Sequence, residues 1–192
     1  MDVMHVSYKT IAGIDEAGRG PLAGPVTAAA VILPSDFDTS ILNDSKKLSE
    51  KRRLAATSVI LEKAVSFGVG WVWASEIDEI NIHNASLLAM KRAVSELNTR
   101  ADLYLADGKY PPDIPGKVRT IIKGDAKEYP IMAASILAKT ARDLWMIRYS
   151  WIEPDWEFDR HKGYPTKKHA ELIRQHGWSA IHRRSFNVPY GS

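Results

Sequence analysis

The 192-residue chain contains no cysteine. Disulfide bonds, thiolate zinc sites and a cysteine nucleophile are therefore excluded. A chain of this kind is compatible with a reducing compartment, and we expect a cytoplasmic protein. The absence of thiols also means that any metal ligands have to come from oxygen or imidazole nitrogen.

Long hydrophobic runs are also missing from the sequence. The longest apolar stretch, residues 27–33, is far shorter than the roughly 20 residues that a membrane-spanning helix needs. Residues 1–10 lack the apolar core of a signal peptide, so we expect no membrane association. Hydrophobic residues still make up 45% of the chain, which is enough for the core of one large domain.

The net charge of the chain is only +3, but positive charge is concentrated near its C-terminal end. Residues 160–184 hold seven Lys or Arg residues against a single acid, Glu171, so the remainder of the chain is net acidic. This asymmetry predicts a basic face for an anionic partner beside an acidic pocket. A basic surface that only faces water gives the same pattern.

Apolar residues follow strand and helix periods in alternation, which predicts an α/β domain with a helical extension at its C-terminal end. We expect strands at residues 11–14, 26–33, 66–73, 102–106 and 118–122. We expect helices at residues 49–65, from residues 78–81 onward, at 131–145 and at 166–176. Ser49 and Thr166 have the side chains that commonly cap a helix N-terminus.

One face of the helix from Ser49 carries apolar residues at helical spacing, and we expect that face to be buried. The residues on it are Leu54, Ser58, Leu61 and Val65. In the strand at residues 66–73, the alternation predicts Trp71 and Trp73 in the core. Gly68 and Gly70 fall on the opposite face of that strand and predict close packing by another element.

Carboxylates follow three of the predicted strands. Asp15 and Glu16 come after the first strand, and Asp107 and Asp125 follow two later ones. If these strands are neighbours, four acids converge where ligands of α/β sheets bind. Like charges about 4 Å apart repel by about 4 kcal/mol at an effective dielectric of 20, so such a cluster needs cations. Oxygen ligands favour magnesium or manganese, and two such ions can drive phosphodiester hydrolysis.

The same residues also have a simpler interpretation. Asp-Gly pairs are ordinary turn formers, and an Asp-Glu pair can simply face water. A strand aims successive side chains at opposite faces. Asp15 and Glu16 can therefore share a site only if the strand breaks there or Glu16 contributes its backbone carbonyl, and we predict one of these two arrangements.

A glycine-arginine-glycine turn, Gly18-Arg19-Gly20, follows the acid pair directly. Glycine lets the backbone approach a partner closely, and the arginine guanidinium is a planar fork of donors that suits phosphate. The turn and the acids together indicate metal-assisted chemistry on a phosphodiester.

Several motifs in the same order resemble ribonuclease HII, the type 2 ribonuclease H family, from about Ile11 to Phe186. They are GIDEAGRGPLAGP at residues 13–25, LNDSKKL at 42–48, DG at 107–108, KGD at 123–125, AASILAK at 133–139, RD at 142–143, KGY at 162–164 and HRRSF at 182–186. The resemblance implies an RNase H-like fold with a mixed central sheet flanked by helices. It implies a catalytic domain at residues 1–150 and a small helical extension at 151–192.

The resemblance also implies an activity. The expected enzyme hydrolyses the RNA strand of RNA/DNA hybrids and incises 5′ of single ribonucleotides in duplex DNA. Two-metal-ion catalysis with magnesium or manganese would leave 3′-hydroxyl and 5′-phosphate ends, in the context of DNA replication and ribonucleotide excision repair. We expect a monomer, and no clamp-binding peptide is evident after Phe186.

Individual site residues follow from matching positions in these motifs. Asp15, Glu16, Asp107 and Asp125 match the family's catalytic, metal-binding acids. Gly18, Arg19 and Gly20 match the turn whose backbone reads the ribose 2′-hydroxyl, the group that distinguishes RNA from DNA. Tyr164 matches the tyrosine that stacks near the junction from ribose to deoxyribose. By charge, the residues expected to contact phosphate are Lys46, Lys47, Arg142, Arg183 and Arg184.

Two rival functions remain open from the sequence. A non-catalytic binder of hybrid or junction duplexes would use only the basic C-terminal face, and a general two-metal nuclease would not discriminate ribose. Four of the six histidines lie at residues 161–182 without metal-ligand spacing, and we expect them to face solvent or phosphate. Asp143 either supports Lys139 or forms a structural ion pair, and the sequence does not decide the roles of Trp151 and Trp156.

Overall fold

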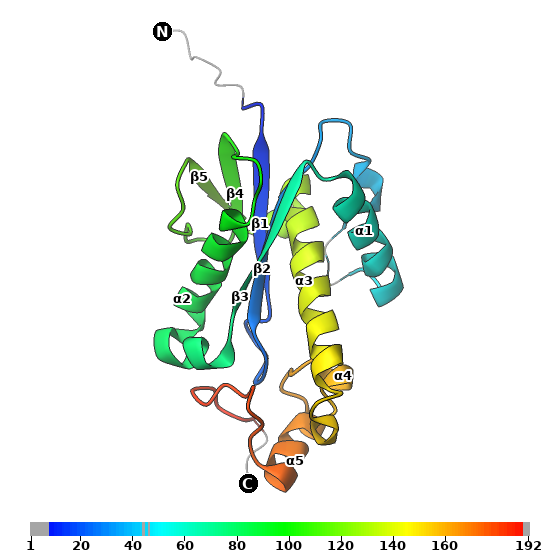
Figure 1. The fold of residues 1–192 in the computed structure, drawn as a ribbon, viewed down its shortest axis with the longest axis vertical. Helices are drawn as coiled ribbons and strands as arrows, with labels where there is room; N and C mark the ends of the chain where they lie inside the picture. Colours follow the sequence, from blue (N-terminus) through cyan, green and yellow to red (C-terminus); the bar gives the residue numbers. More distant parts are fainter. Residues whose placement is uncertain (1–7, 44, 46, 190–192) are drawn as a thin grey trace.

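Five strands form one mixed sheet in the computed structural model, which describes residues 8–43, 45 and 47–189 (Figure 1). The order across the sheet is β3-β2-β1-β4-β5. The bounds are β1 Ile11–Ala17, β2 Val26–Ile32, β3 Ser66–Val72, β4 Leu103–Asp107 and β5 Val118–Ile121. The pairs β1–β2 and β2–β3 are antiparallel, whereas β1–β4 and β4–β5 are parallel.

Helices cover both faces of this sheet (Figure 1). The α-helices are α1 Glu50–Lys63, α2 Ala74–Ser95, α3 Tyr129–Tyr149, α4 Phe158–His161 and α5 Lys167–His176. Three 3-10 helices are Thr39–Ile41, Gly124–Ala126 and Pro154–Trp156. One core lies between the sheet and α2, and a second core joins the sheet to α1 and α3. The predicted mixed sheet flanked by helices is therefore confirmed.

The side chains of β1 divide between these two layers. Ala12 and Ile14 belong to the core under α2. Gly13 faces the start of α3, where a Cβ atom would overlap the backbone of Pro130. Since strand side chains alternate between faces, Asp15 lies on the same side as Gly13, and α3 therefore covers it. The lack of a side chain at residue 13 is what lets α3 approach the central strand.

Gly68 and Gly70 confirm the prediction of close packing against β3. A Cβ atom at Gly68 would overlap the carbonyl oxygen of Ala93, and one at Gly70 would overlap that of Ala89. Both carbonyls belong to α2. The helix therefore lies directly on the backbone of this edge strand.

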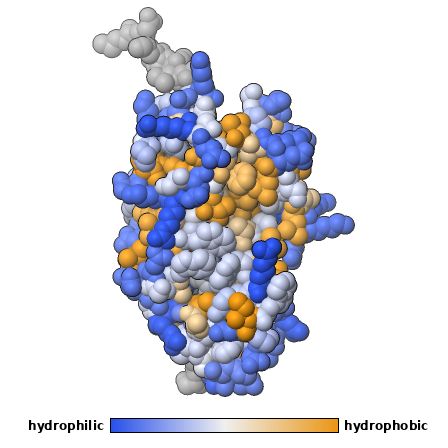
Figure 2. Space-filling model, viewed as in Figure 1, coloured by the Kyte–Doolittle hydropathy of each residue, from blue (hydrophilic) through white to orange (hydrophobic). Residues whose placement is uncertain are grey.

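The predicted buried face of α1 is wrong. Leu54, Leu61 and Val65 are exposed, while the buried positions of the helix are Arg53, Ala56, Thr57 and Ile60. Polar contacts with α3 set this orientation, including a 2.9 Å bond between the hydroxyls of Thr57 and Thr140. Figure 2 shows that apolar residues gather in the upper half of this face of the molecule.

The placement of Trp73 in the core is also wrong. Trp71 is only partly buried, and Trp73 is 42% exposed at the start of α2. The two rings stack on each other at 5.9 Å, and Trp73 contacts Trp145 of α3 at 5.3 Å. Trp73 directly follows β3, an edge strand, and the neighbouring rings of Trp71 and Trp145 pack against it.

The start of α2 lies before the predicted position. The helix begins at Ala74, but Asn81 interrupts it with a left-handed φ of 64°. The Asn81 side-chain oxygen accepts hydrogen bonds from the backbone N–H groups of His83 and Asn84, which is the geometry of an N-cap. The predicted helix start at residues 78–81 therefore corresponds to the second half of α2.

The C-terminal segment packs against the loop that follows β1. Leu22 donates to the Gly163 carbonyl, Gly24 donates to that of Ile181, and Arg183 donates back to that of Leu22. The predicted caps of α1 and α5, Ser49 and Thr166, are both confirmed. The division of the chain at residue 150 stays a prediction.

Two tryptophans that the sequence left undecided lie in or near this segment. Trp156 is partly buried, and its indole N–H donates to the Gly177 carbonyl at 3.3 Å, so it packs within the segment. Trp151 is 76% exposed.

Among the described helices, none combines the length and the apolar character that crossing a bilayer requires.

Replacing Gly70 by alanine should destabilise the protein by about 2 kcal/mol, because the added methyl group forces α2 away from β3. Chemical denaturation measures the change. Gly20→Ala is the matched control, since a Cβ atom there meets no neighbour within 4 Å. Equal stability of the two variants would contradict the close packing of α2 on the strand.

Candidate active site

Three carboxylates meet at the end of the central strands. Asp15, Asp107 and Asp125 each contribute one oxygen atom, and these atoms lie within 4.8 Å of one another. Asp15 and Asp125 are buried, and Asp107 is partly buried. The sequence prediction that separate acids converge at one edge of the sheet is confirmed for these three residues.

The parallel pairing of β1 and β4 brings two of the acids together. Ile14 pairs with Ala106, so the next residues along the two strands, Asp15 and Asp107, lie side by side. Strands that run in the same direction end at the same edge of a sheet, which is why two residues far apart in sequence become neighbours.

A short turn after β5 supplies the third acid. Lys123 adopts a left-handed φ of 58°, and the following residues, Gly124–Ala126, form a 3-10 helix. The Gly124 N–H donates to Asp107 Oδ1 at 2.6 Å, which ties the turn to β4. Asp125 is thereby held next to the acid of the neighbouring strand.

Glu16 does not join this group. The strand β1 continues through Glu16 to Ala17, so the prediction that the strand breaks at the acid pair is wrong. The Glu16 carboxylate instead pairs with Arg19 at 3.3 Å. Within the described residues the three-acid group does not include Glu16. Contribution of the Glu16 backbone carbonyl stays a prediction.

The two adjacent acids both hold their protons more tightly than usual. The pKa of Asp15 is raised well above its ordinary value, first by burial and then by the charges of Glu16 and Asp107. Hydrogen bonds from Ser135 and from the Glu16 N–H oppose this rise. Burial also raises the pKa of Glu16, against the effect of Arg19. The cluster is therefore short of positive charge.

These donors fit a hard divalent cation. The three acids offer only carboxylate oxygens, the ligand type that magnesium and manganese prefer. A cation would also offset the repulsion that raises the Asp15 pKa. Asp15, Asp107 and Asp125 are thus the residues that could hold a metal.

A cavity of about 220 Å³ opens beside the acids. Its lining comes from the end of β1 and the turn after it (Glu16, Ala17, Gly18, Arg19 and Gly20), from Ser45, from α3 (Ser135 and Lys139) and from Tyr164. The glycine-arginine-glycine turn and Tyr164 therefore line the same cavity, although Gly20 and Tyr164 are 144 positions apart in the sequence. Ser45, Ser135 and Lys139 lie within the matched motifs at residues 42–48 and 133–139, but they were not among the predicted site residues.

Arg142 and Arg183 require a correction. Both side chains are fully buried, so they are not placed to contact phosphate directly. Arg142 donates to the carbonyls of Pro25, Lys162 and Ala23 at 2.9–3.0 Å. Burying a cation is costly unless polar partners surround it, and here backbone carbonyls take that role. The buried guanidinium groups therefore stabilise the backbone of the loops that they contact.

Arg183 holds the glycine-arginine-glycine turn itself. Its guanidinium donates to the carbonyls of Gly18 at 2.6 Å, Arg19 at 3.0 Å and Gly24 at 2.9 Å. The C=O and N–H of a trans peptide point in opposite directions, and no described peptide bond is cis. The N–H groups of Arg19 and Gly20 therefore point away from Arg183.

Gly18 is required at the start of this turn. Its φ is 93°, a conformation that favours glycine, and a Cβ atom would overlap the Arg142 side chain. The two buried arginines and the glycine thus fix the direction of the turn's peptide groups.

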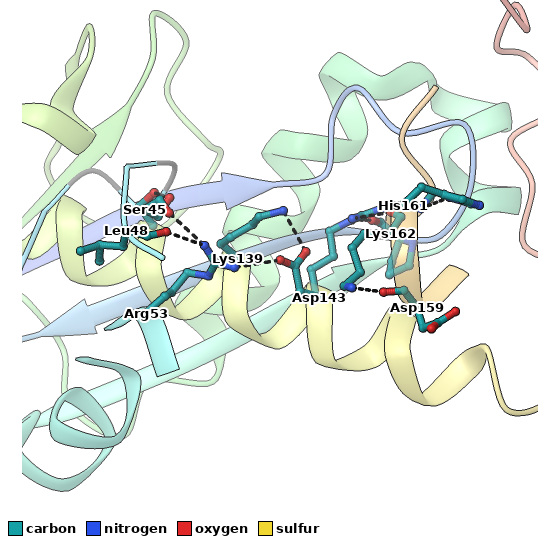
Figure 3. Close-up of polar contacts among 12 residues, drawn as sticks. Ser45, Leu48, Arg53, Lys139, Asp143, Asp159, His161 and Lys162 are labelled. Carbon is teal, nitrogen blue, oxygen red and sulfur yellow. Dashed lines mark hydrogen bonds and ion pairs between the residues drawn. The ribbon is translucent and has the colours of Figure 1, made fainter. Parts of the chain in front are cut away.

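A polar network supports the opposite wall of the cavity (Figure 3). Lys139 donates to Asp143 Oδ1 at 2.8 Å, and Arg53 donates to Asp143 Oδ2 at 3.3 Å. The Lys139 ammonium also lies 5.0 Å from the centre of the Tyr164 ring, which permits a cation–π interaction. Both interpretations of Asp143 therefore hold, because its ion pairs are structural and one of them positions Lys139.

The remaining basic residues differ in their surroundings. Lys47 and Arg184 are exposed, and the Arg184 guanidinium lies 5.1 Å from the centre of the Trp178 ring. Arg19 is exposed beside Glu16. Lys46 lies outside the described residues. Phosphate contact by these four side chains stays a prediction.

The mixed sheet and its flanking helices form an RNase H-like fold, with a cluster of acids at the end of the central strands. The family model for ribonuclease HII matches residues 12–188. A ribonuclease HII from Treponema denticola is 52% identical over 194 residues, covering 93% of this chain and 98% of its own length. The chain therefore belongs to the ribonuclease HII family.

Solved structures confirm the RNase H-like fold. The ribonuclease H2 from Pyrococcus horikoshii superposes with a TM-score of 0.78 at 24% identity, over 93% of this chain and 94% of that one. Bst-RNase HIII, solved in complex with Mn²⁺, has a TM-score of 0.73 at 18% identity, over 93% of this chain and 67% of that one. At these identities the likeness shows the fold alone.

Family membership confirms the expected enzyme class. Ribonucleases HII cleave the RNA of RNA/DNA hybrids and excise ribonucleotides, so this chain is an RNase H endonuclease that acts on nucleic acid. Use of divalent metal is a family property, and the acid cluster agrees with it.

Asp15→Asn should stabilise the metal-free protein at neutral pH and weaken its response to metal. The native state raises the Asp15 pKa, so it binds more protons than the unfolded chain, and stability falls as pH rises from the unfolded pKa through the native one. Asparagine cannot ionise and escapes this loss.

Thermal unfolding between about pH 5 and pH 8, with and without Mn²⁺, measures both effects of Asp15→Asn. Asp113→Asn is the matched control, because that acid is exposed and pairs only with Lys91 among the contacts described for it. A variant with the wild-type metal response would contradict a metal site at Asp15.

Proposed function

We propose that the chain hydrolyses the RNA strand of RNA/DNA hybrids and incises 5′ of single ribonucleotides in duplex DNA. Two divalent ions, magnesium or manganese, would serve the reaction and leave 3′-hydroxyl and 5′-phosphate ends. The observation that carries the proposal is the buried group Asp15, Asp107 and Asp125 beside a cavity lined by the glycine-arginine-glycine turn and Tyr164.

The acids account for the hydrolytic step. Bound at these carboxylates, divalent ions supply a nucleophilic water and stabilise the leaving 3′ oxygen. The pKa of Asp15 is raised first by burial, and a cation bound at these acids would favour its ionised form. Glu16, next to Asp15 on β1, adds negative charge to the same edge and is partly neutralised by Arg19.

The turn after β1 accounts for selection of ribose. Arg183 draws the carbonyls of Gly18 and Arg19 inward, so the N–H groups of Arg19 and Gly20 are directed away from the protein interior. Hydrogen bonds from such backbone groups to a 2′-hydroxyl would distinguish ribose from deoxyribose. The absence of a side chain at Gly20 leaves room for a sugar to approach.

Tyr164 accounts for recognition of the junction. Its ring is 37% exposed at the cavity, with Lys139 on one side and the buried Arg142 at 5.7 Å from the ring centre. An aromatic ring held this way can stack on a sugar or base and disfavour a second 2′-hydroxyl on the next nucleotide. The Lys139 ammonium places positive charge beside the same position, where a phosphate could bind.

The non-catalytic rival explains less of this geometry. A duplex binder needs basic residues on its surface, but it has no use for three acids held together where burial raises a pKa. Beyond the reaction, we propose a monomer that acts in the cytoplasm, in ribonucleotide excision repair alongside DNA replication. Family membership supports this setting.

Asp125→Asn should lower kcat by more than about 100-fold, since even groups that only orient metal ligands typically account for 10–100-fold. The assay uses end-labelled duplex DNA with one ribonucleotide, with all-DNA and RNA/DNA duplexes as controls, in Mg²⁺, Mn²⁺ or chelator. Asp113→Asn should cleave like the wild type. Full activity of Asp125→Asn, or binding without any cut by the wild type, would reject the proposal.

Tyr164→Ala should reduce cleavage at a single ribonucleotide by about tenfold more than cleavage of a long hybrid, because one stacking contact is lost. The measured quantity is the ratio of kcat/KM on the two substrates. Tyr110→Ala, an exposed tyrosine outside the cavity, is the control. An unchanged ratio in Tyr164→Ala would show that the ring has no part in recognising the junction.

A further inference from the structure

Three histidines form a buried stack beneath Tyr164. His161, His169 and His182 are all buried, so the expectation that they face solvent or phosphate is wrong for these three, whereas His176 is exposed. The rings of His161 and His169 are parallel within 19° at 4.1 Å, and His182 lies 5.1 Å from His169. The Phe158 ring contacts all three imidazoles.

Backbone contacts determine which nitrogen of each ring carries the proton. The Ser179 N–H donates to His182 Nδ1 at 2.8 Å, so the proton of neutral His182 lies on Nε2. That nitrogen is 3.0 Å from His169 Nε2, which must accept. The proton of His169 then lies on Nδ1, 2.9 Å from the Tyr164 carbonyl, which can only accept. One directed chain therefore runs from Ser179 to Tyr164.

His161 holds Gly163, the residue before Tyr164, by a hydrogen bond whose direction follows from the same reasoning. Its Nε2 lies 2.7 Å from the Trp156 carbonyl and must donate, and its Nδ1 accepts from the Gly163 N–H at 3.1 Å. Lys162 and Gly163 adopt left-handed φ angles of 51° and 80°. The left-handed φ of Lys162 is strained and persists only when surrounding contacts hold this turn. Imidazole nitrogens hold the two residues that follow it, Gly163 and Tyr164.

Only neutral imidazoles satisfy the chain. A proton added to His169 would place two donors against each other at the Nε2 pair, and a proton added to His182 Nδ1 would face the Ser179 N–H donor. Burial, followed by the neighbouring imidazole, lowers the pKa of His169 to about 4 and that of His182 to about 3. The positive charge of Arg184 also lowers the pKa of His182. The chain is therefore intact at neutral pH.

We propose that His169 is a positioning residue that sets the backbone of Tyr164, and that His182 fixes the tautomer in which His169 does so. The inference rests on the proposed role of Tyr164 at the junction. The buried side of the turn then takes part in substrate selection, because the His169 ring and the Thr166 N–H both bond the carbonyl of the residue whose ring lines the cavity.

His169→Phe keeps the ring volume and removes the hydrogen bond to Tyr164. We expect the preference for a single ribonucleotide over a long hybrid to fall by about fivefold, the effect of one lost hydrogen bond. His169→Asn places an amide N–H where Nδ1 was and should restore part of the preference. His176→Phe, on the exposed face of the same helix, should leave the preference unchanged.

A double-mutant cycle with Tyr164→Ala separates positioning from general damage. If His169 acts through Tyr164, His169→Phe should have no further effect on the preference once the tyrosine ring is gone. Additive losses would overturn the proposal, as would an unchanged preference in His169→Phe. If Tyr164→Ala itself keeps the wild-type preference, the proposed role of Tyr164 fails first, which distinguishes the two results.

Two further measurements cover the case in which His169→Phe does not fold. His182→Asn keeps an acceptor for Ser179 but breaks the link to His169, and it should lower the same preference. In the wild type, ¹⁵N nuclear magnetic resonance at pH 7 should show the proton of His169 on Nδ1 and that of His182 on Nε2. The opposite tautomers would overturn the proposal.

Discussion

Repulsion among three carboxylates is the constraint on which the rest of the site depends. Asp15, Asp107 and Asp125 present oxygens within 4.8 Å of one another. Burial raises the pKa of Asp15, and the charges of Glu16 and Asp107 raise it further. The fold maintains this arrangement by long-range means, through parallel pairing of β1 with β4 and a turn anchored to Asp107. A cation would relieve the repulsion between the acids. The unfavourable interaction in the metal-free protein therefore favours the binding of metal and substrate.

On the other side of the cavity, buried positive charge orients the backbone of two loops. Arg142 and Arg183 have no acidic partner among their described hydrogen bonds, and six carbonyl oxygens surround their guanidinium groups. They therefore impose a direction on the loop after β1 and on the turn before Tyr164. Under the proposed function, the acids at one edge of the sheet would hold cations, and the loops that the arginines orient would present backbone groups and an aromatic ring to the sugar.

Local patterns predicted the elements well and their contacts less well. Ser49 and Thr166 cap the helices expected of them, and Gly68 and Gly70 mark the close approach of α2, because caps and glycine contacts depend on few neighbours. The buried face of α1 did not follow from its apolar stripe, since polar contacts with α3 decide its orientation. The sequence also did not predict the burial of Arg142 and of the three histidines, because the type of a residue does not show which groups surround it in the fold.

The sequence by itself determined that acids follow strands, that no thiol competes for metal, and that a glycine-rich turn stands next to the first acids. Its motifs also indicated the family. Only the tertiary structure decided that Glu16 stays apart from the three clustered acids, that two arginines serve the loop backbone, and that a chain of imidazoles reaches the Tyr164 carbonyl. The physical reason is that strand and helix periods are local, whereas strand pairing and burial join residues more than 100 positions apart, as for Gly18 and Arg183.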